Sequence, residues 1–272
     1  MLLSEVEIRQ LKINSGTKKT FVFDLDGTII YDGFRLTKDF EEVLANIVNM
    51  GHRIYFATGR SYRDFIPMLP EWCVNFPSVV FGGGLVVNRG DIIHQKFLPS
   101  DIIKDLCHYL DSQHVPYLID SHQRYFHSKT ESWILPDILR ISGQIPSNDL
   151  DKLLSDGIYK VLILNNEYSK YCTSLAKEHC LEIKFHSYND CFDIMPSGVN
   201  KYDGIKYLPL SNHDDIFVFG NDHNDLELMQ NFHNSVMFGD FAELLPYAKV
   251  KIAYDEDKFA NFERVVNTIL AK

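Results

Sequence analysis

A short apolar run that ends in two carboxylates is the most informative stretch of the chain. Residues 21–23 are Phe, Val and Phe, and they run directly into Asp24, Leu25 and Asp26 before Gly27 turns the chain. The run predicts a buried strand whose carboxylates lie at the C-terminal edge of a sheet, where open α/β sheets bind ligands. Alternate residues of a strand share a face, so Asp24 and Asp26 are expected to converge on one centre. An acidic turn without chemistry is the alternative.

The pattern that follows predicts a helix and a second strand. Between residues 38 and 50 the apolar positions recur at intervals of three and four, which indicates an amphipathic helix with Thr37 as its N-cap and Gly51 beyond its end. Residues 53–58 form the next apolar run, which also ends in polar residues, Thr58-Gly59-Arg60. A strand, helix, strand unit has parallel strands and a right-handed crossover. Both polar ends are therefore expected at one edge of the sheet.

A third strand is predicted at 78–81, and Gly82-Gly83-Gly84 closes it as a hinge or a loop on the substrate side. From residue 84 the pattern changes to α+β. A β-hairpin is expected around Asn88-Arg89-Gly90-Asp91, because aliphatic residues flank this turn. Helices are predicted at 100–113, 149–154 and 169–178, strands at 117–119, 124–127, 159–164 and 182–185, and a proline-containing loop around Trp133. We interpret residues 84–189 as a separate domain inserted between core strands.

The parallel pattern returns in the last third of the chain. Strands are predicted at 192–195, 215–219, 235–238 and 249–252, with helices after residues 200 and 225 and at the C-terminus. The predicted fold is an α/β protein with a Rossmann-like parallel core, built from residues 1–83 and 190–272, and an inserted α+β domain. Residues 1–19 are expected to be a surface extension of the core.

Composition and charge argue against some classes of partner. The chain has 272 residues and a formal net charge of -10, whereas nucleic-acid binding depends on Lys and Arg side chains that neutralise phosphates. No stretch reaches the roughly 18 apolar residues of a membrane helix, and residues 1–19 lack the apolar run of a signal peptide. The five cysteines are scattered and form no Cys-x-x-Cys pair, which favours reduced thiols. We expect a cytoplasmic monomer or small homo-oligomer that binds neither nucleic acid nor membrane.

Four polar clusters follow predicted core elements and are expected to meet in space. They are Asp24 with Asp26, Thr58, Lys201 and the loop 221–225. Carboxylates suit Mg²⁺, which takes oxygen ligands, and the metal with Lys201 would balance the charge of a phosphate. Asp24 would then attack phosphorus as a carboxylate nucleophile. A lysine at a helix start lies at the unfavourable end of the helix dipole, which indicates an anionic partner for Lys201.

These clusters, in this order, resemble the four motifs of the haloacid dehalogenase superfamily. The matching sequences are Asp24-Leu-Asp26-Gly-Thr-Ile, Thr58-Gly59-Arg60, Lys201 and Gly220-Asn-Asp-His-Asn-Asp225. The insertion between the second and third motifs is similar to the α/β cap of the Cof-like sugar phosphatase branch. The resemblance implies a Mg²⁺-dependent phosphatase that hydrolyses small phosphorylated metabolites, such as sugar phosphates, through an aspartyl-phosphate, with the cap choosing the substrate.

The resemblance also implies a role for each matching residue. Asp24 would be the nucleophile, and Asp26 would protonate the leaving oxygen and later activate water. Thr58, Gly59 and Lys201 would bind the phosphoryl oxygens. Asp24, the main-chain carbonyl of Asp26 and the acidic loop would hold Mg²⁺.

The acidic loop departs from the family pattern at one position. Where the family has Gly-Asp-x-x-Asn-Asp, this chain has Asn221 in the place of the first Asp, and Asp222 follows it. An amide oxygen can ligate a metal but brings no charge, so a lower affinity for Mg²⁺ is expected. Asn221 and Asp225 are the expected metal-binding residues of this loop, and Asp222 is a further candidate, directly or through water.

Two other functions remain open from the sequence. A phosphomutase or phosphotransferase would use the same site with an alcohol acceptor in place of water. A non-catalytic metabolite-binding protein is suggested by Asn221. Arg124, His127 and Trp133 either line a pocket of the inserted domain or only pack it, and His223 is a minor candidate for substrate contact.

Overall fold

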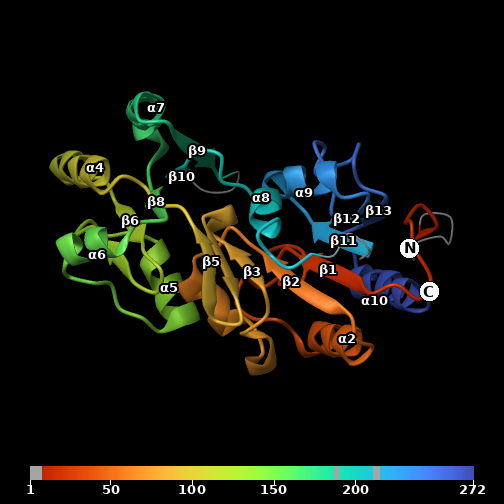
Figure 1. Cartoon of the computed structure of the whole chain (residues 1–272). Coiled ribbons are helices and arrows are strands. Elements are labelled where there is room, and N and C mark those ends of the chain that lie inside the picture. Colours follow the sequence, from red (N-terminus) through yellow and green to blue (C-terminus); the bar gives the residue numbers. More distant parts are fainter. Residues whose placement is uncertain (1–7, 187–189, 211–214) are drawn as a thin grey trace. The chain divides into compact units, whose positions relative to one another are not determined.

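The computed structural model describes residues 8–186, 190–210 and 215–272, and the chain divides into two compact units (Figure 1). Unit 1 comprises Met1–Gly59, Met68–Ile93 and Asn200–Lys272, and unit 2 comprises Arg60–Pro67 and His94–Val199. Each unit has a sheet of its own. This confirms the predicted α/β core with an inserted α+β unit. Within the described ranges, no helix combines the length and the apolar character that crossing a bilayer requires.

Unit 1 is built on an eight-stranded mixed sheet. In spatial order its strands are β13 (Val250–Ile252), β12 (Asn234–Phe238), β11 (Asp215–Gly220), β1 (Lys19–Phe23), β2 (Arg53–Ala57), β3 (Ser78–Val80), β4 (Leu85–Asn88) and β5 (Asp91–Gln95). β1 lies in the interior and pairs in parallel with β2 and β11, as the βαβ pattern predicts. Phe23 at the end of β1 pairs with both Phe56 and Phe219, so these three strands end at the same edge.

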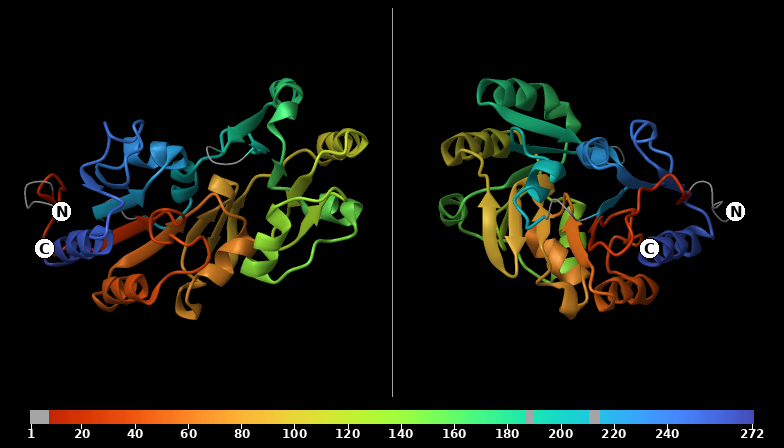
Figure 2. Two further views of the ribbon diagram at one scale, coloured as in Figure 1. Left: turned by 180° about the vertical axis from the view of Figure 1, so that it is seen from behind. Right: turned by 45° about the vertical axis from the view of Figure 1, so that its right-hand side comes forward.

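Helices cover both faces of this sheet (Figure 2). They are α2 (Lys38–Asn49) and α10 (Lys258–Leu270) on one face, and α8 (Lys201–Ile205) and α9 (Leu226–Asn231) on the other. Successive side chains of β1 point to opposite faces of the sheet and pack against both helix layers. Phe23 contacts Phe262 of α10 edge to face, whereas Val22 belongs to the cluster that contains Ile205 and Leu228. Burying each such side chain contributes about 1.5–3 kcal/mol, and a strand covered on both faces has a continuous apolar sequence.

Unit 2 is a five-stranded antiparallel sheet with helices on its faces. Its strands, in spatial order, are β7 (Tyr125–His127), β6 (Tyr117–Asp120), β8 (Lys160–Ile163), β10 (Phe192–Pro196) and β9 (Leu181–Phe185). Its helices are α3 (Tyr62–Phe65), α4 (Ser100–Ser112), α5 (Ile134–Ser142), α6 (Leu150–Asp156) and α7 (Ser169–Glu178). Tyr117 and Ile119 pack in the cluster with α4, α6 and α7, and Leu118 between them packs in the cluster with Ile138 of α5. This alternation is the period of two that a strand requires.

Two predicted elements belong to the other unit. The hairpin strands β4 and β5 extend the sheet of unit 1, where β4 pairs antiparallel with β3. β10 pairs antiparallel with β8 and β9 in unit 2, and not with the parallel core strands. The expected boundaries at residues 84 and 190 therefore differ from the division near residues 94 and 200. A short apolar run predicts a strand, but the partner of that strand is decided by the rest of the fold.

Two further segments differ from the expectation. α5 occupies part of the expected loop. Its Pro136 is compatible with a helix because it lies in the first turn, where proline costs no hydrogen bond. The N-terminal extension packs on unit 1 in its described part: Ile8 and Leu11 are buried, and the Lys12 main-chain N–H donates to Asn234 Oδ1 at 2.7 Å. Residues 1–7 of the expected surface extension lie outside the described residues.

Gly83 allows two segments of unit 1 to approach closely. Its φ is +114°, and a Cβ there would lie 2.2 Å from the main-chain oxygen of Asn200. Asn200 is the N-cap of α8, and its side chain accepts a hydrogen bond from the Asp203 main-chain N–H. The glycine therefore sets the position of the helix start that carries Lys201.

Gly83→Ala is expected to lower the free energy of unfolding by about 2–5 kcal/mol. The added methyl group combines left-handed strain, about 1–2 kcal/mol, with overlap against main-chain atoms, about 1–3 kcal/mol. Gly51→Ala is the matched control, because Gly51 has a φ of +83° but nothing within 4 Å of its Cβ. Urea unfolding of both variants measures the difference, and equal losses would show that the approach to Asn200 contributes nothing.

Candidate active site

The residues singled out from the sequence gather at one edge of the unit 1 sheet. Asp24 directly follows β1, Thr58 follows β2 and Asn221 follows β11, and these three strands are neighbours. The Asp24 main-chain N–H donates to the carbonyl of Phe219 at 2.9 Å, which continues the β1–β11 ladder to the site. Lys201 is the first residue of α8. The four motifs, far apart in the chain, therefore lie within unit 1, except that Arg60 of the second motif belongs to unit 2.

Lys201 joins two of the motifs through buried ion pairs. Its Nζ lies 2.6 Å from Asp24 Oδ1 and 2.7 Å from Asp225 Oδ1, and all three side chains are buried. The anionic partner expected from its place at a helix start is therefore present. Burial disfavours the charge, but Asp225 and Asp24 outweigh burial and raise the pKa of Lys201 above its ordinary value. The side chain is a fixed positive charge at neutral pH.

Asp24 has a hydrogen-bond donor on each oxygen. Lys201 lies at Oδ1, and Thr28 Oγ1 donates to Oδ2 at 2.9 Å. Burial raises the pKa of Asp24 well above its ordinary range; Lys201 opposes the rise, and the carboxylates of Asp225 and Asp222 add to it. Several carboxylates share one ammonium group here, so a further cation would favour the charged form of Asp24.

Asp225 holds the acidic loop together. Its Oδ2 accepts from the main-chain N–H groups of Asn221 at 2.8 Å and Asp222 at 3.3 Å, while its Oδ1 accepts from Lys201. A Cβ on Gly220 would lie 2.3 Å from Asp225 Cγ, so the loop requires glycine at this position. Both carboxylate oxygens of Asp225 are therefore occupied by donors of the loop and of α8.

Three oxygen atoms converge beside this ion-paired cluster. The inward atom of the Asn221 amide group lies 3.1 Å from Asp24 Oδ2 and 3.0 Å from the main-chain oxygen of Asp26, and an oxygen in this place also lies 3.4 Å from the Thr28 hydroxyl. Ligands held 2.0–2.1 Å from Mg²⁺ at right angles to each other are about 2.9 Å apart. In the described part of the chain, no three His, Cys, Asp or Glu side chains form a metal-ligating group. The fit to Mg²⁺ therefore depends on amide and main-chain oxygens together with Asp24.

Two residues of the site were not anticipated from the sequence. Thr28 is fully buried and bonds Asp24; its place four residues further on in the same motif was the available signal. Tyr254 Oη donates to the carbonyl of Gly27 at 2.6 Å and lies against the Asn221 amide. Burial raises the pKa of Tyr254 to about 12, so its hydroxyl stays protonated. Tyr254 lies 227 residues from Gly27, and no local pattern marks it.

The minor candidates from the sequence are His223, Arg124, His127 and Trp133, and the first three contact polar groups near them. His223 pairs with an exposed glutamate at 2.8 Å, and Arg124 forms an ion pair with an aspartate of unit 2. The ring nitrogens of His127 contact oxygen atoms of the loop that follows it, at 2.6 and 2.5 Å. Trp133 is 48% exposed at the start of α5. These contacts account for His223, Arg124 and His127 without a substrate.

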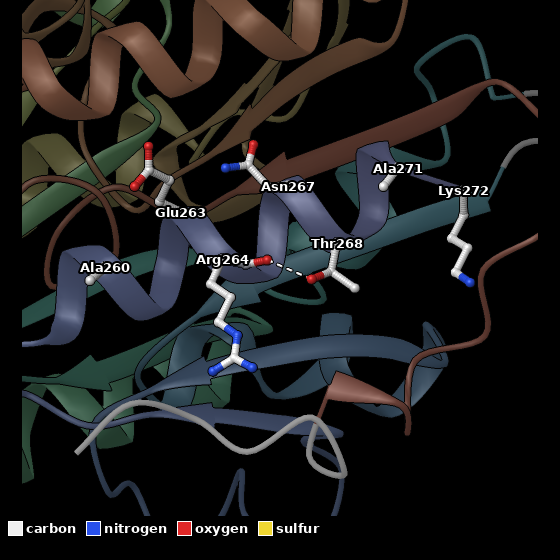
Figure 3. A pocket seen from close by; sticks show the side chains of 7 residues that line it. All are labelled: Ala260, Glu263, Arg264, Asn267, Thr268, Ala271 and Lys272. Atoms are coloured by element: carbon white, nitrogen blue, oxygen red, sulfur yellow. Dashed lines mark hydrogen bonds between the residues drawn. The ribbon is translucent and has the colours of Figure 1, made fainter.

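A surface hollow of unit 1 lies apart from the motifs. It runs along α10 and is lined only by side chains of this helix and the two residues after it (Figure 3). The bond from Thr268 Oγ1 to the carbonyl of Arg264, 2.8 Å long, is internal to the helix. None of the predicted site residues takes part in this hollow.

Lys201→Met is expected to destabilise the protein by about 3–5 kcal/mol, because it leaves buried carboxylates without their cation. Lys206→Met is the matched control: Lys206 lies just after α8, is 53% exposed and pairs with the similarly exposed Asp203. An exposed pair contributes at most about 1 kcal/mol. Urea midpoints of both variants decide the point, and similar losses would contradict a buried charge cluster.

The model of the haloacid dehalogenase-like hydrolase family matches residues 21–257. The chain therefore belongs to this family and is a hydrolase. This confirms the family resemblance that the four motifs indicate, and it agrees with the α/β core described above.

Known proteins of similar sequence and fold include phosphatases. The chain is 25% identical over 222 residues to 5-amino-6-(5-phospho-D-ribitylamino)uracil phosphatase YitU of Bacillus subtilis (strain 168), covering 76% of this chain and 81% of that protein. It is 25% identical over 249 residues to the HMP-PP phosphatase of Serratia proteamaculans (strain 568), covering 84% and 88%. The structure of the HAD subclass IIB sugar phosphatase BT4131 matches with a TM-score of 0.72 and 16% identity, over 93% of this chain and 100% of that one. The last likeness shows a shared fold.

Proposed function

We propose that this hydrolase is a Mg²⁺-dependent phosphatase that hydrolyses small phosphorylated metabolites through a phosphoryl intermediate on Asp24. The main support is that the two oxygens of Asp24 have different partners. Oδ1 is paired with Lys201, and Oδ2 belongs to the three-oxygen cluster, which it forms with the main-chain oxygen of Asp26 and the side-chain oxygen of Asn221. A carboxylate between a fixed ammonium group and a metal site is suited to attack an anionic phosphate. The phosphatase names of the two relatives, and the sugar phosphatase of similar fold, support the reaction class.

The metal is assigned to Asp24 Oδ2, the main-chain oxygen of Asp26 and the side-chain oxygen of Asn221. When bound there, Mg²⁺ offsets the negative charge that builds up on the transferring phosphoryl group. We assign Asp225 to holding Lys201 and the loop, because both its oxygens already accept hydrogen bonds. Asp222 adds negative charge nearby and is kept as a ligand through water.

In the first step Oδ1 of Asp24 attacks phosphorus, since Oδ2 is assigned to the metal. A bond forms between Oδ1 and phosphorus while the bond from phosphorus to the leaving oxygen breaks. Asp26 donates a proton to the leaving oxygen, which departs as an alcohol. Thr58, Gly59 and Lys201 hold the phosphoryl oxygens in place, and such positioning supplies much of the rate enhancement of phosphoryl transfer.

In the second step water attacks the phosphorus of the intermediate. Asp26, now a carboxylate, accepts the proton of that water, and the bond between Oδ1 and phosphorus breaks. Inorganic phosphate leaves and Asp24 is restored. Asp26 is protonated again at the end of the cycle, as it was at the start.

Unit 2 is assigned to the choice of substrate. The motifs of unit 1 recognise only a phosphoryl group, so discrimination between metabolites needs side chains from elsewhere in the chain. The similar proteins act, by their names, on a phosphorylated ribitylaminouracil, on HMP-PP and on sugar phosphates, which are all small phosphorylated molecules. The five cysteines are free thiols, in agreement with a cytoplasmic enzyme.

The test is phosphate release from a panel of sugar phosphates, nucleotides, cofactor phosphates and p-nitrophenyl phosphate, with Mg²⁺ and with a chelator. Metal-dependent release from at least one small phosphomonoester is expected. Turnover only after addition of an alcohol acceptor would instead indicate a phosphotransferase. Binding of a phosphorylated metabolite with no turnover of any member would indicate a non-catalytic binding protein.

A further inference from the structure

The Asn221 amide can satisfy its surroundings in two orientations. With Oδ1 inward, the amide oxygen faces Asp24 Oδ2 and the main-chain oxygen of Asp26, which are also acceptors. The Thr28 hydroxyl lies 3.4 Å from this oxygen but makes its shorter bond, 2.9 Å, to Asp24 Oδ2. Three acceptors in contact repel one another unless a cation lies between them. This orientation therefore matches a site loaded with Mg²⁺.

A half-turn of the amide group exchanges its oxygen and nitrogen, so that a donor faces the two acceptors. Nδ2 then donates to Asp24 Oδ2 at 3.1 Å and to the main-chain oxygen of Asp26 at 3.0 Å, and Oδ1 accepts from Tyr254 Oη at 3.1 Å. Every polar atom of the amide group has a partner in this orientation, and no cation is required. This arrangement suits the metal-free protein, because contacts between acceptors are replaced by hydrogen bonds.

Tyr254 is a suitable partner for both orientations because a hydroxyl both donates and accepts. With the amide oxygen inward, the Tyr254 hydroxyl can accept from Nδ2 while it donates to the carbonyl of Gly27, 2.6 Å away. With the amide nitrogen inward, the hydroxyl proton turns to Asn221 Oδ1. The site therefore changes state without moving the main chain.

Gly27 allows the Asn221 amide group to lie close to the main chain of the first motif. A Cβ on Gly27 would lie 2.2 Å from Asn221 Nδ2 and 3.0 Å from Tyr254 Oη, so the planar group is held closely between them. The main chain of Asn221 is also held in place, because its N–H donates to Asp225 Oδ2 at 2.8 Å. A planar amide occupies nearly the same volume in its two orientations, and an ionised aspartate at this position would supply no donor.

We propose that Asn221 is a two-state ligand, with its oxygen inward when Mg²⁺ is bound and its nitrogen inward when Mg²⁺ is absent, and that Tyr254 is the positioning residue for both states. The inference rests on the metal site of the proposed function. The amide group closes the metal-free site with hydrogen bonds, so Mg²⁺ binds weakly and leaves readily.

The test measures Mg²⁺ binding by calorimetry and thermal stability with and without Mg²⁺, for the wild type and Asn221→Asp. Asn221→Asp is expected to tighten the Kd for Mg²⁺ on the order of 10-fold or more, because ligand charge sets affinity for hard cations. It is also expected to lower the metal-free Tm and to enlarge the rise in Tm on adding Mg²⁺. Asn231→Asp, at the exposed end of α9, adds the same charge outside the motifs and should not tighten the Kd.

A measurement on the wild type keeps the inference testable if Asn221→Asp fails to fold. The side-chain NH₂ signal of Asn221, observed by ¹⁵N NMR, is expected to shift as Mg²⁺ is added, since the amide protons leave a carboxylate for a hydroxyl. In Tyr254→Phe the metal-free Tm should fall, because the amide oxygen loses its donor.

The outcomes separate the two proposals. Mg²⁺ binding with the same Kd in Asn221→Asp, or with no change of the Asn221 amide signal, overturns the two-state ligand and leaves the phosphatase standing. Absence of Mg²⁺ binding by both proteins, together with absence of metal-dependent phosphate release, overturns the proposed function and the inference with it.

Discussion

Asp24→Asn is expected to reduce metal-dependent phosphate release by about 10⁴-fold or more. Loss of the nucleophile in an enzyme with a covalent intermediate removes most of its rate enhancement. The asparagine amide cannot form the bond to phosphorus, and it offers a neutral oxygen at most to the metal. Steady-state release from the best substrate of the panel measures the loss, and acid-quenched protein should carry no phosphoryl group.

The stability of the same variant distinguishes lost chemistry from lost fold. Burial raises the pKa of Asp24 in the folded state, so the contribution of this group to stability is present at low pH and is lost as pH rises through the raised pKa. The neutral asparagine escapes that loss, and Lys201 keeps Asp225 at 2.7 Å as its partner. Asp24→Asn should therefore be no less stable than the wild type at pH 8. An active Asp24→Asn would exclude Asp24 as the nucleophile.

Asp26→Asn is expected to lower the turnover of metabolite esters by about 10²–10⁴-fold, the usual effect of removing a general acid and base. The loss depends on the leaving group, because p-nitrophenolate departs without protonation whereas a sugar alcohol does not. With p-nitrophenyl phosphate the variant should still form the intermediate on Asp24 but hydrolyse it slowly. A burst of one nitrophenolate per site, followed by slow turnover, is the expected time course.

Asp32→Asn is the control for this variant. Asp32 lies in the turn that follows the motif, is exposed, and accepts from the main-chain N–H of Phe34 at 2.8 Å. Its replacement should leave turnover nearly unchanged. If Asp26→Asn lost equal activity with good and poor leaving groups and gave no burst, the proton transfers would have to be assigned to another residue.

The parallel core could be predicted because its signals are local. The run at residues 21–23 is continuous and apolar because β1 is covered on both faces, and the helix α2 shows its buried stripe in the periodicity of its sequence. Pairing of β1 with β2 follows from the short crossover between them. The turn Arg89-Gly90, where both residues have positive φ, identified the hairpin.

Pairing over long distances could not be predicted. The apolar run of β10 is equally suited to a parallel core strand and to the antiparallel sheet of unit 2 where it lies.

Two further segments were not predicted. Pro136 suggested a loop, yet α5 tolerates it in the first turn. The burial of Ile8 and Leu11 depends on packing against distant parts of unit 1.

By itself, the sequence determined the family and the order of the four motifs. It also predicted roles for Asp24, Asp26, Thr58 and Lys201, because strand ends and helix starts can be recognised within a few residues. Only the tertiary structure decided how those groups divide their contacts. It placed Asp225 on Lys201 and set the Asn221 amide between Gly27 and Tyr254. The reason is that a hydrogen bond or an ion pair acts over about 3 Å, and which side chains come that close depends on how the whole chain packs.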